Sequence, residues 1–160
     1  MAIKLICIGK NKDDSIRVLA ENYLNKIKPY VNIKQIVLPD TSLTKTNTTD
    51  IVIRKESERL LNYLAKNKTK GKNPFVIVLD KEGKMFDSLQ LARILSDRLE
   101  RYEIIIIIGG VYGISEEVKE KADLLLSISK LTFTHRMVRI IILEQIYRSL
   151  TIISNKKYHY

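Results

Sequence analysis

The stretch IIIIIGGVYGIS, residues 104–115, decides the fold. It opens with five consecutive isoleucines, Ile104–Ile108, and such an uninterrupted β-branched run is typical of a strand that is covered on both faces. The run therefore predicts a central strand in a mostly parallel sheet. After this strand come three glycines and then Ser115, a favourable N-cap for a following helix. They predict a turn where a ligand can approach the backbone closely and meet the free N–H groups of the helix start.

On both sides of this strand, short apolar segments alternate with amphipathic helical patterns. Five such alternations are the signature of βαβ units, so the predicted fold class is α/β, a mostly parallel sheet with flanking helices. No linker or repeat divides the chain, which predicts a single domain over residues 1–160. A turn is expected at residues 81–84 and a mobile surface loop at residues 41–50. The other expected strands are residues 3–8, 33–38, 75–79 and 124–128, and the expected helices are residues 16–27, 51–67, 88–99, 116 onward and 134–154.

The last expected helix is apolar on nearly all sides. Because a helix on the surface of a domain shows a single apolar stripe, we expect a second subunit to cover part of this one, which predicts a homodimer. At its start, His135 and Arg139 lie four residues apart and project from one face. From spacing alone they are either an exposed helix end or part of a site, while Glu144 and Arg148 suit an ion pair.

The formal charge of +10 on 160 residues favours a polyanionic partner, usually nucleic acid. The basic residues gather at residues 66–72 and near the C-terminus, where Tyr158, His159 and two lysines suit stacking and phosphate contact, unless this end is simply frayed. A single cysteine, Cys7, excludes a cysteine-cluster metal site, and no metal is expected. The chain has no apolar run of membrane-spanning length and no signal-like start, which predicts a cytoplasmic protein.

Two common phosphate-binding motifs are absent from the glycine-rich stretch. Its spacing is not GxGxxG, and no GKS or GKT follows it. Dinucleotide binding is therefore disfavoured, and a P-loop hydrolase is excluded. Asp80, at the end of an expected strand, suits either a turn former or a general base.

Several further segments are distinctive when taken together with IGGVYGIS. They are VLDKEGK at residues 78–84, LSISKLTFTHRMVR at residues 126–139, LEQIYR at residues 143–148 and the closing YH at residues 158–159. In order, spacing and chain length they resemble the ribosomal RNA large subunit methyltransferase H family, which consists of S-adenosylmethionine-dependent enzymes of the SPOUT class. The resemblance covers essentially the whole chain.

The resemblance implies a homodimer with a deep trefoil knot in its C-terminal half, an exception to the rule against threaded chains. It also implies that the enzyme methylates the N3 nitrogen of a pseudouridine in large-subunit (23S) ribosomal RNA, on assembled ribosomes, with S-adenosyl-L-methionine as cofactor. The positions that match the family's cofactor contacts are Leu79, Gly109, Ile128, Ser129, Lys130, Leu131, Thr132 and Phe133.

Four positions match residues that the family places near the substrate, namely His135, Arg139, Tyr158 and His159. We expect His135 or His159 to help the imide proton leave, and Arg139 to stabilise the developing negative charge or to bind phosphate. The chain departs from the family in two places, because it has Thr134 where relatives usually have proline and because it ends in YHY.

Two other functions are compatible with these patterns. The basic clusters alone would suit a non-catalytic RNA- or ribosome-binding module, and the SPOUT features would suit a methyltransferase acting on transfer RNA. Binding of S-adenosylmethionine separates the first from an enzyme, and the identity of the methylated RNA separates the second.

Overall fold

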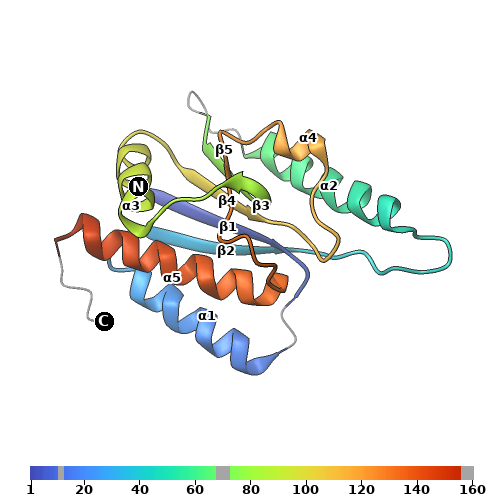
Figure 1. Cartoon of the computed structure of the whole chain (residues 1–160), viewed down its shortest axis with the longest axis horizontal. Coiled ribbons are helices and arrows are strands. Elements are labelled where there is room, and N and C mark those ends of the chain that lie inside the picture. The colour runs from blue at the N-terminus through green and yellow to red at the C-terminus, as the bar shows by residue number, and fades with distance from the viewer. Residues whose placement is uncertain (11–12, 68–72, 156–160) are drawn as a thin grey trace.

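The computed structural model describes residues 1–10, 13–67 and 73–155. In this part of the chain, five parallel strands form the middle layer of the molecule in the order β2-β1-β4-β3-β5 (Figure 1). This confirms the predicted α/β class. The strands are β1 (Ala2–Ile8), β2 (Asn32–Leu38), β3 (Phe75–Lys84), β4 (Ile104–Ile108) and β5 (Leu124–Leu126).

The isoleucine run forms the central strand, as predicted. Strand β4 pairs with β1 on one side and β3 on the other, and all five of its side chains are buried. Because side chains alternate along a strand, Ile104, Ile106 and Ile108 enter one hydrophobic core and Ile105 and Ile107 enter the other. A β-branched run can satisfy both cores at once, which is why it is uninterrupted.

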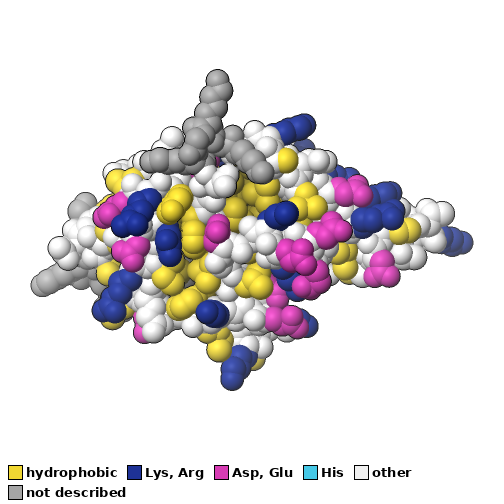
Figure 2. All heavy atoms as spheres, turned by 90° about the horizontal axis from the view of Figure 1, so that it is seen from above, with side chains coloured by type: hydrophobic (Ala, Val, Ile, Leu, Met, Phe, Trp, Pro, Cys, Tyr) yellow, Lys and Arg dark blue, Asp and Glu magenta, His cyan; other side chains and the backbone are white. Residues whose placement is uncertain are grey.

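Helices cover both faces of the sheet. Helices α1 (Asp14–Ile27), α3 (Ser88–Leu99) and α5 (His135–Ile153) pack on one face, and α2 (Thr49–Lys66) and α4 (Glu116–Lys119) lie on the other. The α2–α4 side, seen in Figure 2, carries acidic side chains among its lysines and arginines. This side is therefore not a uniformly basic surface.

Helix α5 lies on the sheet between α1 and α3 (Figure 1). These neighbours and the sheet bury Ile142, Leu143 and Ile146, so much of the cover expected from a second subunit comes from within the chain. Ile141 and Ile152 remain half-buried and outside both cores. The homodimer and the trefoil knot stay predictions, while the expected Glu144–Arg148 ion pair is confirmed at 2.6 Å.

The turn predicted at residues 81–84 is wrong, because β3 continues to Lys84. Residues Leu79 and Lys84 both pair with Leu126, so the four residues between them bulge out of the ladder. The local turn chemistry is present, since the N–H of Glu82 donates to Asp80 Oδ1 at 2.9 Å, yet pairing with β5 continues beyond it. Strand β5 also ends two residues earlier than predicted, at Leu126.

Gly83 allows this close pairing. A Cβ atom there would lie 2.7 Å from the backbone of Leu125 and Leu126, so Gly83→Ala must push β3 and β5 apart. We expect this substitution to lower the free energy of unfolding by about 1–3 kcal/mol, measured by urea denaturation. Glu82→Ala, an exposed neighbour on the same strand, is the control, and equal stability of the two variants would contradict the prediction.

The expected mobile loop at residues 41–50 is tied to α2, whose first residues overlap it. The Arg59 guanidinium donates to Pro39 O at 3.0 Å and to Thr41 Oγ1 at 2.7 Å, and Lys55 Nζ donates to Asn47 Oδ1 at 3.1 Å. Cys7 is buried, as expected for a small apolar side chain. Within the described residues, no helix is long and apolar enough to cross a membrane.

Candidate functional site

The sheet topology opens a crevice beside the central strand. The connection after β1 leads through α1 to β2, and the connection after the neighbouring β4 leads through α4 toward β5, in the opposite direction. Ligands of open α/β sheets bind outside the carboxyl ends of strands at such a switch point. A cleft of about 860 Å³ lies on the β3 side of this switch point, beside the carboxyl end of β4, the middle of β3, the segment after β5 and the start of α5.

The glycine-rich turn forms one wall of the cleft. It closes through a hydrogen bond from Gly113 N to Gly110 O at 3.2 Å, and Gly113 has a φ of 96°, in the left-handed region that favours glycine. At Gly109, a Cβ atom would lie 2.4 Å from Ile114 Cγ1. The glycines thus serve the turn's own geometry, and the turn exposes its backbone to the cleft.

The segment between β5 and α5 forms the opposite wall. Its shape is fixed by Ser127 Oγ, which donates to Ser129 O at 3.1 Å, and by Leu131 N, which donates to Ser129 Oγ at 3.0 Å. Seven of the eight expected cofactor residues meet around the cleft. They are Leu79, Gly109, Ile128, Ser129, Leu131, Thr132 and Phe133.

Lys130, the eighth expected cofactor residue, is exposed and lies outside the cleft lining. The next helix begins at once after this segment, with Thr134 as N-cap, and Thr134 Oγ1 accepts from Met137 N at 3.4 Å. The threonine therefore offers α5 a side-chain cap at the position where relatives usually have proline.

His135 stands at the mouth of the cleft, half-buried in the first turn of α5. Burial lowers the pKa of its imidazole, the positive charges of Arg139 and Arg136 lower it further, and Asp40 acts in the opposite direction. The imidazole is consequently neutral at physiological pH and can accept a proton.

Arg139 lies beneath His135 and does not line the cleft. It is 2% exposed, and its Nη2 donates to the carbonyl oxygens of Ile8 and Gly9 at the end of β1. Among the described residues, these two carbonyls are the hydrogen-bond partners of its guanidinium, and the positive charge of Arg139 acts on His135 electrostatically. Tyr158 and His159, the other expected substrate residues, lie outside the described residues.

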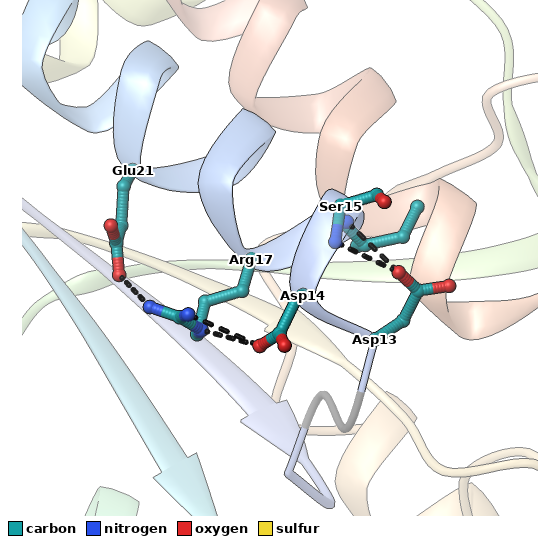
Figure 3. A network of polar contacts seen from close by, with 6 residues as sticks. Asp13, Asp14, Ser15, Arg17 and Glu21 are labelled. Atoms are coloured by element: carbon teal, nitrogen blue, oxygen red, sulfur yellow. Dashed lines mark hydrogen bonds and ion pairs between the residues drawn. The ribbon is translucent and has the colours of Figure 1, made fainter.

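Two aspartates in the cleft lining were not assigned to the cofactor from the sequence. Asp80 is only 12% exposed, and its Oδ2 lies 3.1 Å from Lys119 Nζ. Asp13 caps α1 by accepting from Ser15 N at 2.9 Å and Ile16 N at 3.3 Å (Figure 3). Asp80 could have been found from its place directly after the expected strand at residues 75–79, whereas nothing in the sequence placed Asp13 beside the segment after β5.

Comparison with known proteins identifies the family. The sequence model described as "Predicted SPOUT methyltransferase" matches residues 1–159. The ribosomal RNA large subunit methyltransferase H of Malacoplasma penetrans is 39% identical over 99% of both chains, and that of Dictyoglomus thermophilum is 39% identical over 100% of both. The chain belongs to the ribosomal RNA large subunit methyltransferase H family of SPOUT methyltransferases.

Two solved structures share this fold at low sequence identity. A probable methylase family protein of Haemophilus influenzae aligns with a TM-score of 0.57 at 14% identity, covering 99% of this chain and 70% of that one. The tRNA (m1G37) methyltransferase of Aquifex aeolicus aligns with a TM-score of 0.55 at 14% identity, covering 92% and 70%. The family membership makes this chain a methyltransferase, and the cleft is its candidate active site.

Proposed function

We propose that this chain methylates the N3 nitrogen of a pseudouridine in 23S ribosomal RNA, on assembled ribosomes in the cytoplasm, as a homodimer with one knotted domain per subunit. The observation that carries the proposal is the convergence of seven expected cofactor residues and His135 on one cleft. The full-length relatives whose name states large-subunit ribosomal RNA as substrate support the choice of RNA.

The cleft fits S-adenosylmethionine by size and chemistry. Its volume of about 860 Å³ lies in the range of small-molecule sites, about 300–1,000 Å³. Leu79, Ile128 and Phe133 offer apolar surface to an adenosyl group. The carboxylate of Asp80, in the same lining, is already paired with Lys119 Nζ at 3.1 Å. Within the described residues, no cluster of His, Cys, Asp or Glu could hold a metal ion.

For this reaction the protein has to align the methyl group with the N3 nitrogen and to remove the N3 proton. Bound S-adenosylmethionine supplies a methyl group already activated on a sulfonium. The glycine turn and the segment after β5 orient the cofactor, while the neutral imidazole of His135 accepts the N3 proton of the base. Burial and, after it, the positive charge of Arg139 favour the neutral imidazole, and the charge of Arg139 also stabilises the anionic base electrostatically.

Exposed basic side chains at the mouth of the cleft suit a nucleic acid. Lys81 and Arg136 line the cleft and are exposed, and Lys130 lies on the same segment as the cofactor residues. Phosphate contacts of this kind orient a protein on RNA without selecting a sequence. A small enzyme with few such contacts gains from a substrate that is already folded, which favours the assembled ribosome.

One labelling experiment tests the proposal. The protein is incubated with methyl-labelled S-adenosylmethionine and either whole ribosomes, free ribosomal RNA or transfer RNA. We expect label in the large-subunit RNA of whole ribosomes, at a single pseudouridine. Label in transfer RNA would overturn the substrate assignment, and absence of cofactor binding in calorimetry would favour a non-catalytic binding module.

The lowered pKa of His135 leads to a prediction about how methylation depends on pH. Because the base must be neutral, methylation falls as pH drops through the His135 pKa, which lies below its ordinary value. Arg139→Met removes the larger of two charges that lower this pKa, so the acidic limb of the kcat profile should move to higher pH. Arg136→Met should move it less, in the same direction.

The measurement is the pH profile of kcat together with the NMR titration of the His135 imidazole. Arg148→Met is the control, because Arg148 sits farther along the same helix and pairs with Glu144. An unchanged limb in folded Arg139→Met protein would contradict the electrostatic role.

A further inference from the structure

Helix α2 carries two consecutive polar residues that are both buried. Glu56 is 4% exposed and Ser57 is 3% exposed. Glu56 occupies the middle of an otherwise apolar stripe of the helix, between the fully buried Val52 and Leu60. A carboxyl group at such a position is costly to desolvate, so packing of the helix does not explain it.

The two residues contact both ends of the glycine turn that walls the cleft. Ser57 Oγ accepts from Ser115 N at 3.1 Å, at the end of the turn. At its beginning, a Cβ atom on Gly110 would lie 2.2 Å from Glu56 Oε2, so the carboxyl group fills the space that a side chain of residue 110 would occupy. Gly110 itself lines the cleft, and Glu56 supports it from behind.

The two carboxyl oxygens of Glu56 have different surroundings. Oε1 accepts from Thr41 N at 2.9 Å, in the loop after β2, whereas Oε2 is buried and has no hydrogen-bond partner among the described residues. Burial raises the pKa of this carboxyl group, as does nearby Asp40, while Thr41 N–H and Arg59 lower it. The residue thus links the loop after β2 to the glycine turn after β4, across the switch point.

We propose that Glu56 and Ser57 are positioning residues, which hold the 109–115 turn from behind in the conformation that binds the cofactor. The inference rests on the proposed function, because it assumes that the cleft takes S-adenosylmethionine. Neither residue lines the cleft, so both act through the backbone of the turn. An apolar residue at position 56 would give the fold at least the same stability. The carboxyl group is explained instead by its contact with Gly110, which fixes the conformation of the turn.

The test compares Glu56→Ala, Glu56→Gln and Ser57→Ala in binding of S-adenosylhomocysteine by calorimetry and in methylation of ribosomes. We expect Glu56→Ala to weaken binding about tenfold and to raise the KM for S-adenosylmethionine similarly. The kcat at saturating cofactor and the KM for ribosomes should change little. Glu56→Gln, which retains the Oε1 acceptor and the volume, should restore most of the affinity, and Ser57→Ala should weaken binding less.

A double variant checks the contact directly. Gly110→Ala should lose cofactor affinity because its methyl group collides with Glu56 Oε2, and Glu56→Ala in the same chain should restore part of that loss. Glu58→Gln, an exposed carboxylate on the same helix, is the matched control and should bind as the wild type does. Wild-type affinity in Glu56→Ala, or an equal rise of both KM values, would overturn the proposal, whereas a wild-type protein that binds no cofactor would overturn the proposed function itself.

Discussion

Replacing His135 by alanine should lower the kcat for ribosome methylation by about 100-fold or more, the usual contribution of a positioned general base. The imidazole is the titratable group at the mouth of the cleft whose lowered pKa leaves it neutral and able to accept a proton. Affinity for S-adenosylhomocysteine should be close to that of the wild type, because the walls formed by residues 109–113 and 128–133 are unchanged. Single-turnover kinetics and calorimetry measure the two quantities.

Chemical rescue makes the test specific to proton transfer. The alanine variant leaves a space beside the cleft that free imidazole can enter, so added imidazole should restore part of the rate, and more of it as pH rises through the pKa of imidazole. The His159→Ala variant is measured in the same way, because His159 is the other candidate for the role of general base. Full activity in folded His135→Ala protein would transfer the role away from His135.

The central strand, the fold class and most of the cleft could be predicted from the sequence because their signals are local. Five consecutive isoleucines suit only a strand between two cores, and the residues of the 126–139 segment are neighbours in the chain before they are neighbours in the cleft. The family resemblance selected the cofactor positions within that segment.

What the sequence could not show depended on contacts between distant segments. The Lys81–Lys84 stretch has turn chemistry, yet its pairing with β5 extends the strand. His135 and Arg139 share a helix face, but the long side chain of Arg139 reaches Ile8 at the end of β1, 131 residues away in sequence. Glu56 interrupts an apolar stripe, a signal visible in the sequence, although only the fold shows that Gly110 lies against it.

The second large effect concerns the homodimer. Helix α5 keeps a half-buried outer edge, marked by Ile141 and Ile152, that neither core covers. If a second copy packs on this edge through a two-fold axis, Ile152→Arg places an unpaired charge in the interface twice, once from each subunit. We expect the dissociation constant of the dimer to rise by about 1,000-fold or more, measured by analytical ultracentrifugation.

Methylation should be lost with the dimer if, as we propose, the two subunits share each site, because the start of α5 carries His135 and other cleft residues. Ile152 lies at the other end of the helix from His135, so the substitution does not touch the cleft directly. Ile53→Arg is the matched control, since Ile53 is also a half-buried isoleucine outside both cores, but on α2 across the sheet. A monomeric Ile152→Arg protein that methylates ribosomes at the wild-type rate would show that each subunit builds a complete site alone.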